Sequence, residues 1–156
     1  MKTLVVYASK YGCTADCASY LKTKISGDVT LVDINKAPKQ IELHSFDTIV
    51  IGGSVYIGKI SKKLRTFCEN NLDVLTKKSI GIFLCAALSE QFNETLKTNF
   101  PALLLKSAKI TALFGSEARL EKLTFLDKTI IKAVTKGDYS QFKIKKETMD
   151  TFANAI

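Results

Sequence analysis

The chain has 156 residues, of which 46% are hydrophobic and 24% charged. Domains usually hold about 100–200 residues, so we expect one domain, residues 1–156, with a substantial core. This composition excludes a mainly disordered, collagen-like or low-complexity protein. No apolar run reaches the roughly 20 residues of a membrane span, and the run at 4–9 is too short for a signal-peptide core. We therefore expect a cytoplasmic location.

Basic residues outnumber acidic residues by 23 to 15, which gives a net charge of +8. The resulting positive field attracts anions, acidic proteins or lipid headgroups without selecting among them. The chain has one histidine and four cysteines without CxxC spacing, so an ordinary zinc-finger ligand set cannot form. We expect no metal site, and free thiols at Cys13, Cys17, Cys68 and Cys85.

Hydrophobic periodicity predicts alternating strands and helices along the first half of the chain. Residues 3–8 are a short aliphatic run, typical of a buried strand. Apolar residues at i, i+4 and i+8 predict a helix over 14–25 that ends at Gly27. A strand over 29–32, a loop at Pro38 and a strand over 47–51, closed by Gly52 and Gly53, are expected next.

The same alternation continues through the second half. A helix begins near Ser61, and a helix with Phe92, Leu96 and Phe100 on one face ends at Pro101. Uninterrupted apolar strands, each followed by a helix, indicate an α/β protein with a parallel sheet covered on both faces. The remaining expected elements are strands over 80–84 and 109–114 and helices over 123–135 and 146–156.

The segment 9–14 joins the first strand to the first helix and is rich in hydroxyl groups. Its glycine permits a tight turn, and the N-terminus of the following helix offers unpaired N–H groups and partial positive charge to an anion. We therefore predict a phosphate-binding loop. Its members are Ser9, Lys10, Tyr11, Gly12, Cys13 and Thr14.

Two more loops follow the third and fourth strands. Segment 52–59 combines glycines with an aromatic residue, which suits a flat ring lying against backbone and stacking on Tyr56. Segment 85–89 supplies small residues whose amides can approach such a ring. Ligands of open α/β sheets bind beyond the carboxyl ends of the strands, so these loops predict a pocket for a ring system with one terminal phosphate. The expected ring contacts are Ser54, Val55, Tyr56, Ile57, Gly58, Ala86, Ala87, Leu88 and Ser89.

Other nucleotide-binding motifs and other kinds of site require residues that this sequence does not have. The motifs GxxxxGK[ST] and GxGxxG need glycines that the first loop does not have. A response-regulator receiver domain needs acidic residues after strands one and three, where this chain has Ala8-Ser9 and Gly52-Gly53. No catalytic triad or paired-carboxylate site is present, and we expect His44 in a surface loop. A redox role for Cys13 and Cys17 is the alternative to simple packing.

At these loops the sequence resembles the flavodoxin family, whose phosphate loop is rich in hydroxyl residues and ends in Gly-x-Thr variants. The segment 9–14 keeps the first hydroxyl and the Gly-x-Thr ending but has Tyr11 where a small hydroxyl residue is usual. Segments 52–59, 99–101 and 122–132 look like features of the branch that includes menaquinone-dependent protoporphyrinogen oxidase. The resemblance implies a flavodoxin-like three-layer sandwich with a five-stranded parallel sheet of order 2-1-3-4-5, and noncovalent FMN as cofactor.

Two functions fit this resemblance, an electron carrier and an FMN oxidoreductase that passes electrons to a quinone. The expected partner is accordingly a redox protein, acidic in the carrier case, or a quinone. A basic module that binds lipid or nucleic acid without catalysis is the third alternative. It lacks an RNA-binding motif or recognition helix, so no nucleic acid is expected.

Residues 119–146 carry eight lysine and arginine residues against three acidic ones, and so hold five of the eight net positive charges. One helical face of this segment is apolar and would suffice to cover the sheet; it consists of Leu123, Leu126, Ile130 and Val134. Two more apolar residues, Phe125 and Ile131, lie outside this face. One hypothesis is a buried helix with a lysine edge. The other is a segment that docks on an anionic membrane, at its inner face, or on an acidic partner.

Overall fold

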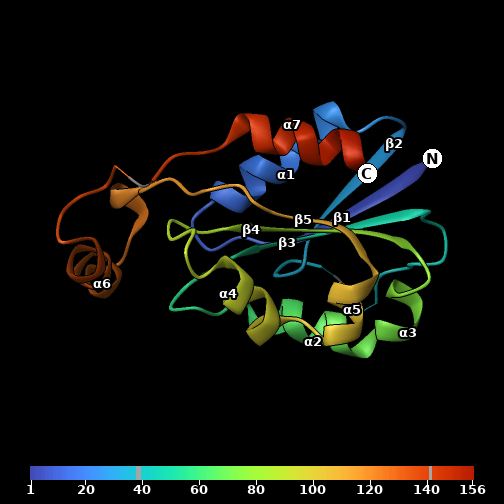
Figure 1. The fold of residues 1–156 in the computed structure, drawn as a ribbon, viewed down its shortest axis with the longest axis horizontal. Helices are drawn as coiled ribbons and strands as arrows, with labels where there is room; N and C mark the ends of the chain where they lie inside the picture. The colour runs from blue at the N-terminus through green and yellow to red at the C-terminus, as the bar shows by residue number, and fades with distance from the viewer. Residues whose placement is uncertain (38–39, 141) are drawn as a thin grey trace.

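The structure is a computed structural model that describes residues 1–37, 40–140 and 142–156. Five strands form one parallel sheet in the order β2-β1-β3-β4-β5, which confirms the predicted fold class and strand order (Figure 1). The strands are β1 (Lys2–Ala8), β2 (Asp28–Asp33), β3 (Thr48–Ser54), β4 (Ser79–Cys85) and β5 (Ala108–Leu113).

Helices cover the sheet on both faces. On one face lie α1 (Cys13–Lys24) and α7 (Lys146–Ala155), which pack against each other (Figure 1). The other face carries α2 (Lys62–Asn70), α3 (Leu72–Leu75), α4 (Phe92–Asn99) and α5 (Ala102–Ser107).

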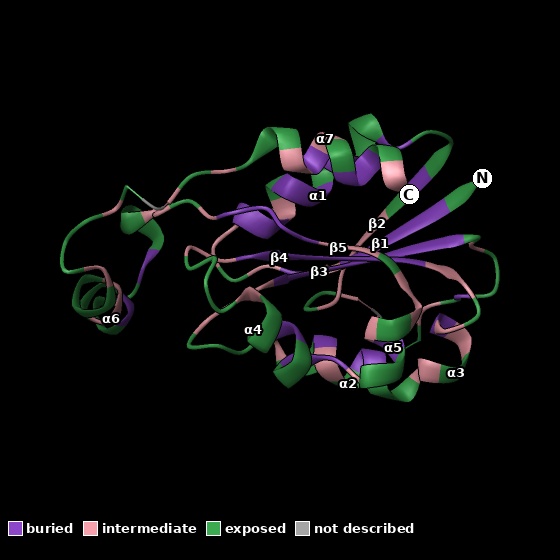
Figure 2. Ribbon diagram, viewed as in Figure 1, coloured by how far each residue is buried: buried purple, intermediate pink, exposed green. Residues whose placement is uncertain are grey.

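The two faces of the sheet contribute to separate apolar clusters, because successive side chains of a strand point to opposite sides. In β1, Leu4 and Val6 join the cluster under α2, α4 and α5, whereas Val5 joins the cluster under α1 and α7. The central strands are buried on both sides (Figure 2). Their continuous apolar sequences follow from this double burial.

One local prediction was wrong, and two short helices were missed. Gly52 and Gly53 do not close the third strand but lie inside β3, where they pair with Phe83 and Leu84 of β4. Pro101 does end one helix, yet α5 begins immediately after it, because proline is tolerated before the first turn of a helix. Helix α3 was also missed. The predicted loop at Pro38 lies outside the described residues.

The hypothesis that the helix over 123–135 is buried against the sheet is also wrong. A short 3₁₀ turn (Leu120–Lys122) precedes this segment, which forms α6 (Phe125–Thr135), and α6 stands away from the sheet (Figure 1). Leu123 is buried, but Phe125, Leu126 and Val134 are 88%, 66% and 59% exposed. Helix α7 takes the place beside α1 instead. None of the described helices is both long and apolar enough to span a bilayer.

Gly52 provides a test of this packing. A Cβ atom there would lie 2.1 Å from Cζ of Phe83, whose ring is fully buried and stacked on Phe114 at a centroid distance of 4.5 Å. We expect Gly52→Ala to lower the free energy of unfolding by about 1–3 kcal/mol, because the Phe83 ring has no free space to move into. Urea denaturation measures this loss.

Gly53→Ala is the matched control. A Cβ atom at this neighbouring position would meet the flexible ends of Ile60 and Leu64 at 3.1 and 3.2 Å, so a smaller loss is expected. Equal losses for the two variants would contradict the proposed role of the Phe83 ring.

Candidate functional site

The predicted phosphate loop is organised by a left-handed turn at Gly12. This residue has φ of 95° and precedes α1 without any side-chain cap. Its N–H donates to Ser9 Oγ at 3.0 Å, and its carbonyl accepts from the Asp16 N–H at 3.0 Å. The first amides of α1 therefore remain available to an anion beyond the carboxyl end of β1.

Two hydroxyl groups of this loop have no hydrogen-bond partner among the described residues. Both Thr14 Oγ1 and the Tyr11 hydroxyl are buried atoms. Buried polar atoms are nearly always hydrogen-bonded in native proteins. These two hydroxyl groups, in a loop that leads into uncapped helix amides, are therefore free to bind the predicted polar ligand.

Basic side chains surround the turn. A Cβ atom on Gly12 would lie 2.6 Å from Arg119 Nη1 and 3.8 Å from Lys122 Nζ. Arg119 also donates to the Tyr11 carbonyl at 3.3 Å and forms ion pairs with Asp16 and Glu117. These ion pairs keep the pKa of Arg119 above its ordinary value.

The second loop is a tight turn anchored to its neighbours. The backbones of Tyr56 and Lys59 exchange two hydrogen bonds of 2.8 and 3.1 Å around Ile57 and Gly58, which both have positive φ. Ser54 Oγ donates to the Ala8 carbonyl at 3.4 Å, so the loop is also tied to the end of β1.

The side chain of Asn99 connects this second loop to α4 through hydrogen bonds. Its side-chain oxygen accepts from the Ile60 N–H at 3.0 Å, and its nitrogen donates to the carbonyls of Gly58 and Thr95 at 2.9 and 2.8 Å. Asn99 is 4% exposed, and this one side chain fixes the loop against α4. Asn99 is thus a positioning residue of the site.

A hollow of about 570 Å³ opens between the first and second loops. This volume lies within the range of about 300–1,000 Å³ that small-molecule sites occupy. Five of the predicted contacts line it together with residues that were not predicted, including Asn35, Lys59 and Ser61. The predicted members are Ser9, Lys10, Ser54, Tyr56 and Ile57.

Helix α6 reaches this site through one carboxylate. Asp127, which is 4% exposed, pairs with Lys10 Nζ at 3.2 Å and accepts a short hydrogen bond from the Tyr56 hydroxyl. The Lys10 ammonium lies 3.1 Å from the centroid of the Tyr56 ring. One face of the predicted stacking residue is therefore covered by Lys10.

The third predicted loop adjoins the second across the sheet. The Val55 N–H donates to the Cys85 carbonyl at 3.0 Å, and Ser54 is in register with Cys85. Ala86 and Ala87 are half-buried, whereas Leu88 and Ser89 are exposed. These four residues do not line the hollow between the first two loops. The same is true of six other predicted contacts, Tyr11, Gly12, Cys13, Thr14, Val55 and Gly58.

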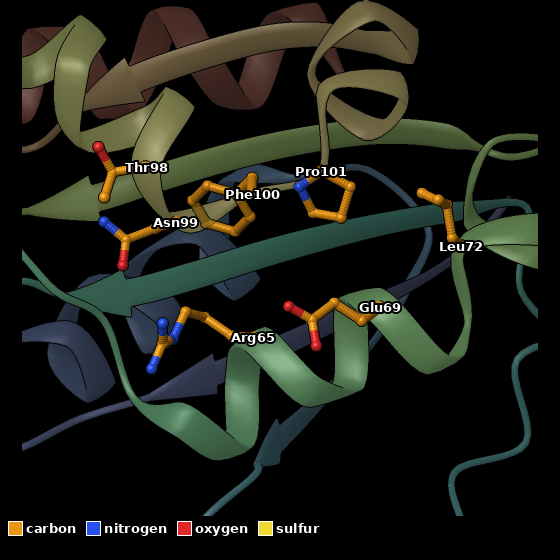
Figure 3. A pocket seen from close by; sticks show the side chains of 7 residues that line it. All are labelled: Arg65, Glu69, Leu72, Thr98, Asn99, Phe100 and Pro101. Carbon is orange, nitrogen blue, oxygen red and sulfur yellow. The ribbon is translucent and has the colours of Figure 1, made fainter.

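A second hollow, of about 420 Å³, lies in the helical layer between α2 and the connection from α4 to α5 (Figure 3). Its charged groups, Arg65 and Glu69, both come from α2. Asn99 borders it, but all the hydrogen bonds of this amide hold the second loop and its own helix. The hollow at the strand ends is therefore the candidate site.

The sequence predicted only part of the surroundings of the thiols. Cys13 and Cys17 are buried on α1 as expected for packing residues, but Cys85 of β4 lies beside them. Asp127, Asn99 and Arg119 were also missed as site residues. Sequence signals for them are weak, because each reaches the site from an element far along the chain. His44 is exposed, as predicted.

Asn99 gives a direct test of how the second loop is held. We expect Asn99→Ala to lower the free energy of unfolding by about 1–3 kcal/mol, because the buried Ile60 N–H loses its acceptor. Hydrogen exchange of the Ile60 amide should accelerate at the same time. Asn93→Ala, at an exposed position of α4, is the control, and the proposed role fails if both variants behave alike.

Comparisons of the sequence and of the structure with known proteins both find flavodoxins. The chain matches the family model for the flavodoxin domain over residues 4–145. No curated protein matches it. A flavodoxin from the domain Archaea has a similar structure, with 19% identity, a TM-score of 0.51 and coverage of 86% of this chain and 93% of its own.

Two further structures share the fold. A WrbA-like flavodoxin from Agrobacterium tumefaciens is 19% identical, with a TM-score of 0.57 and coverage of 98% of this chain and 95% of its own. A flavoprotein from Lactobacillus acidophilus, solved in complex with FMN, is 17% identical, with a TM-score of 0.51 and coverage of 73% and 90%. Together with the match over residues 4–145, the fold places this chain in the flavodoxin domain family.

Proposed function

We propose that the protein binds FMN noncovalently at the ends of β1 and β3 and transfers electrons through it. The observation that carries this proposal is the loop at Gly12, which contains uncapped helix amides and the Thr14 hydroxyl without a hydrogen-bond partner. The match of the chain to the flavodoxin domain family supports the same assignment. The flavin supplies the redox chemistry, and protein groups set its binding and orientation.

Each loop has a proposed task in this site. Ser9, Gly12 and Thr14 hold the phosphate, with Lys10 as the nearby positive charge. The second loop, Ser54–Gly58, and the third, Ala86–Ser89, flank the isoalloxazine ring, and Tyr56 is the stacking residue. Since Lys10 lies over the Tyr56 ring and pairs with Asp127, stacking on that face requires Lys10 to turn toward the phosphate.

Calorimetric titration of the flavin-free protein tests the site. We expect FMN to bind at least about tenfold more tightly than riboflavin, because only FMN carries the phosphate that the helix N-terminus attracts. Gly12→Val should remove most of this preference, since a branched side chain strains the left-handed turn and obstructs the amides. Equal affinity of the unaltered protein for the two flavins would reject the phosphate site.

Gly137→Val is the matched control for backbone strain. Gly137 also has positive φ, at 80°, and a Cβ atom there would meet no other atom within 4 Å. It should leave the preference for FMN unchanged. If it abolishes the preference as well, the effect of Gly12→Val reflects general destabilisation.

A second, finer proposal concerns the electron acceptor. We propose a quinone-linked oxidoreductase that resembles menaquinone-dependent protoporphyrinogen oxidase and works at an anionic membrane surface. Its support is α6, which exposes Phe125 and Leu126 next to exposed lysines while Asp127 of the same helix reaches the flavin site. A carrier that serves an acidic protein partner is the alternative.

Vesicle co-sedimentation distinguishes the quinone-linked oxidoreductase at a membrane surface from the electron carrier. We expect binding to anionic but not to neutral vesicles, with loss of binding in high salt, because each lysine near an anionic surface contributes about 1 kcal/mol. Reversing the exposed Lys128, Lys132 and Lys136 to Glu should abolish it. Absence of binding at low salt would favour the carrier.

The control reverses three other exposed lysines outside α6, namely Lys77 after α3, Lys106 in α5 and Lys109 in β5. The change in net charge is identical. Equal loss of binding in both triple variants would show that overall charge, and not α6, attracts the membrane.

A further inference from the structure

Three cysteine side chains meet beneath the phosphate loop. Cys13 and Cys17 lie one turn apart on α1, and Cys85 is the last residue of β4. Their Sγ atoms all lie within 4.8 Å of one another, and the Cys17 and Cys85 atoms are 3.8 Å apart. The three residues are 8%, 2% and 3% exposed, so the cluster is shielded from solvent.

This spacing matches the geometry of sulfur atoms around a shared metal ion. Metal–thiolate bonds are about 2.3 Å long, so two sulfurs on one ion lie about 3.8 Å apart in a tetrahedral arrangement and about 4.0 Å apart in a trigonal one. The Cys17–Cys85 distance of 3.8 Å already has the tetrahedral value, and the two distances that involve Cys13 are at most 4.8 Å. Two elements fix their positions, the helix α1 and the central strand β4.

The surroundings favour negative charge at one edge of the cluster. Cys13 opens α1, where the helix dipole is positive. The Arg119 guanidinium adds positive charge on this side, since its Nη1 would lie 2.6 Å from a Cβ atom on Gly12, the residue before Cys13. The other sides are apolar, lined by the cluster that α1 and α7 share.

The number of ligands selects the kind of metal. Among the described residues, no fourth cysteine, histidine or carboxylate joins these three sulfurs. Structural zinc and iron–sulfur sites usually take four protein ligands, whereas soft Cu(I) prefers thiolates and three of them complete a trigonal shell. A shielded site without a fourth ligand therefore fits the soft monovalent ion.

We propose that Cys13, Cys17 and Cys85 form a three-thiolate site for a soft monovalent metal ion of the Cu(I) type. Binding replaces whatever protons the three sulfur atoms still carry, these protons pass to solvent, and no electron is transferred. The bound complex has a net charge of about −2, since three thiolates outweigh one monovalent ion. The helix N-terminus and Arg119 lie on the side where this charge is best compensated. The proposal does not depend on FMN.

Cys68 is the internal control. It is buried in the cluster on the opposite face of the sheet, and burial raises the pKa of its thiol to about 12. It does not belong to the group of neighbouring sulfurs. A Cys68→Ser variant therefore changes the cysteine count without touching the proposed site.

The experiment is an anaerobic titration of the reduced, full-length protein with Cu(I) in competition with a chromophoric Cu(I) chelator. We expect about one bound ion per chain, with release of thiol protons. Ser or Ala at position 13, 17 or 85 should each weaken binding about 100-fold or more, since loss of even an outer-shell contact costs 10–100-fold. Cys68→Ser should bind like the unaltered protein.

Circular dichroism and urea denaturation of each variant establish that it is folded, and the Ser and Ala series together guard against one failed variant. Failure of the folded, fully reduced protein to compete for Cu(I) would overturn the proposal and leave the cysteines as packing residues. Cu(I) binding that persists in all three cluster variants would overturn it too. So would a native Cys17–Cys85 disulfide, detected as the loss of two hydrogens in mass and of two titratable thiols.

Discussion

The left-handed turn at Gly12 is the constraint on which both proposed sites depend. With φ of 95°, it lets the chain leave the buried strand β1 and enter α1 at once, without a capping side chain. The uncapped amides then face the strand ends, while the first turn of α1 directs Cys13 and Cys17 toward Cys85 beneath the loop. A residue with a Cβ atom at this position would be strained and would press on Arg119. The conformation of this one glycine therefore sets the direction of α1, and that direction serves both the proposed anion site and the thiol cluster.

The sequence predicted the sheet and its order correctly because strands buried on two faces must be apolar throughout, and the helices between them leave few alternative topologies. It misplaced Gly52 because a glycine pair usually ends a strand, whereas here the ring of Phe83 fills the space that a side chain would occupy. The loops of the candidate site followed from the topology. Asn99 and Cys85 did not, since no local pattern reveals that an amide on α4 supports the second loop or that a strand end meets two cysteines of α1.

Helix α6 shows how periodicity predicts a helix without predicting its partner. Its apolar residues align on one face, as expected of a helix that covers a sheet. In the structure, both faces of the sheet are already covered, by α1 and α7 on one side and by α2 to α5 on the other (Figure 2). No sheet surface remains for α6, so Leu126 and Val134 are exposed to solvent. An exposed apolar helix bordered by lysines is a feature that monomeric proteins rarely retain without an interaction that uses it.

An ion pair and a hydrogen bond connect this helix to the proposed flavin site. Asp127 is the buried carboxylate of α6, and it neutralises Lys10 while it accepts a hydrogen bond from Tyr56. Under the proposed function, a phosphate on the first loop attracts Lys10, and a ring on the second loop occupies the face of Tyr56 that Lys10 covers. Asp127 then competes with the cofactor for the same two side chains. Because the carboxylate belongs to α6, occupancy of the proposed flavin site and the position of the exposed helix are linked through this ion pair and this hydrogen bond, and a surface that displaces α6 would act on the same linkage.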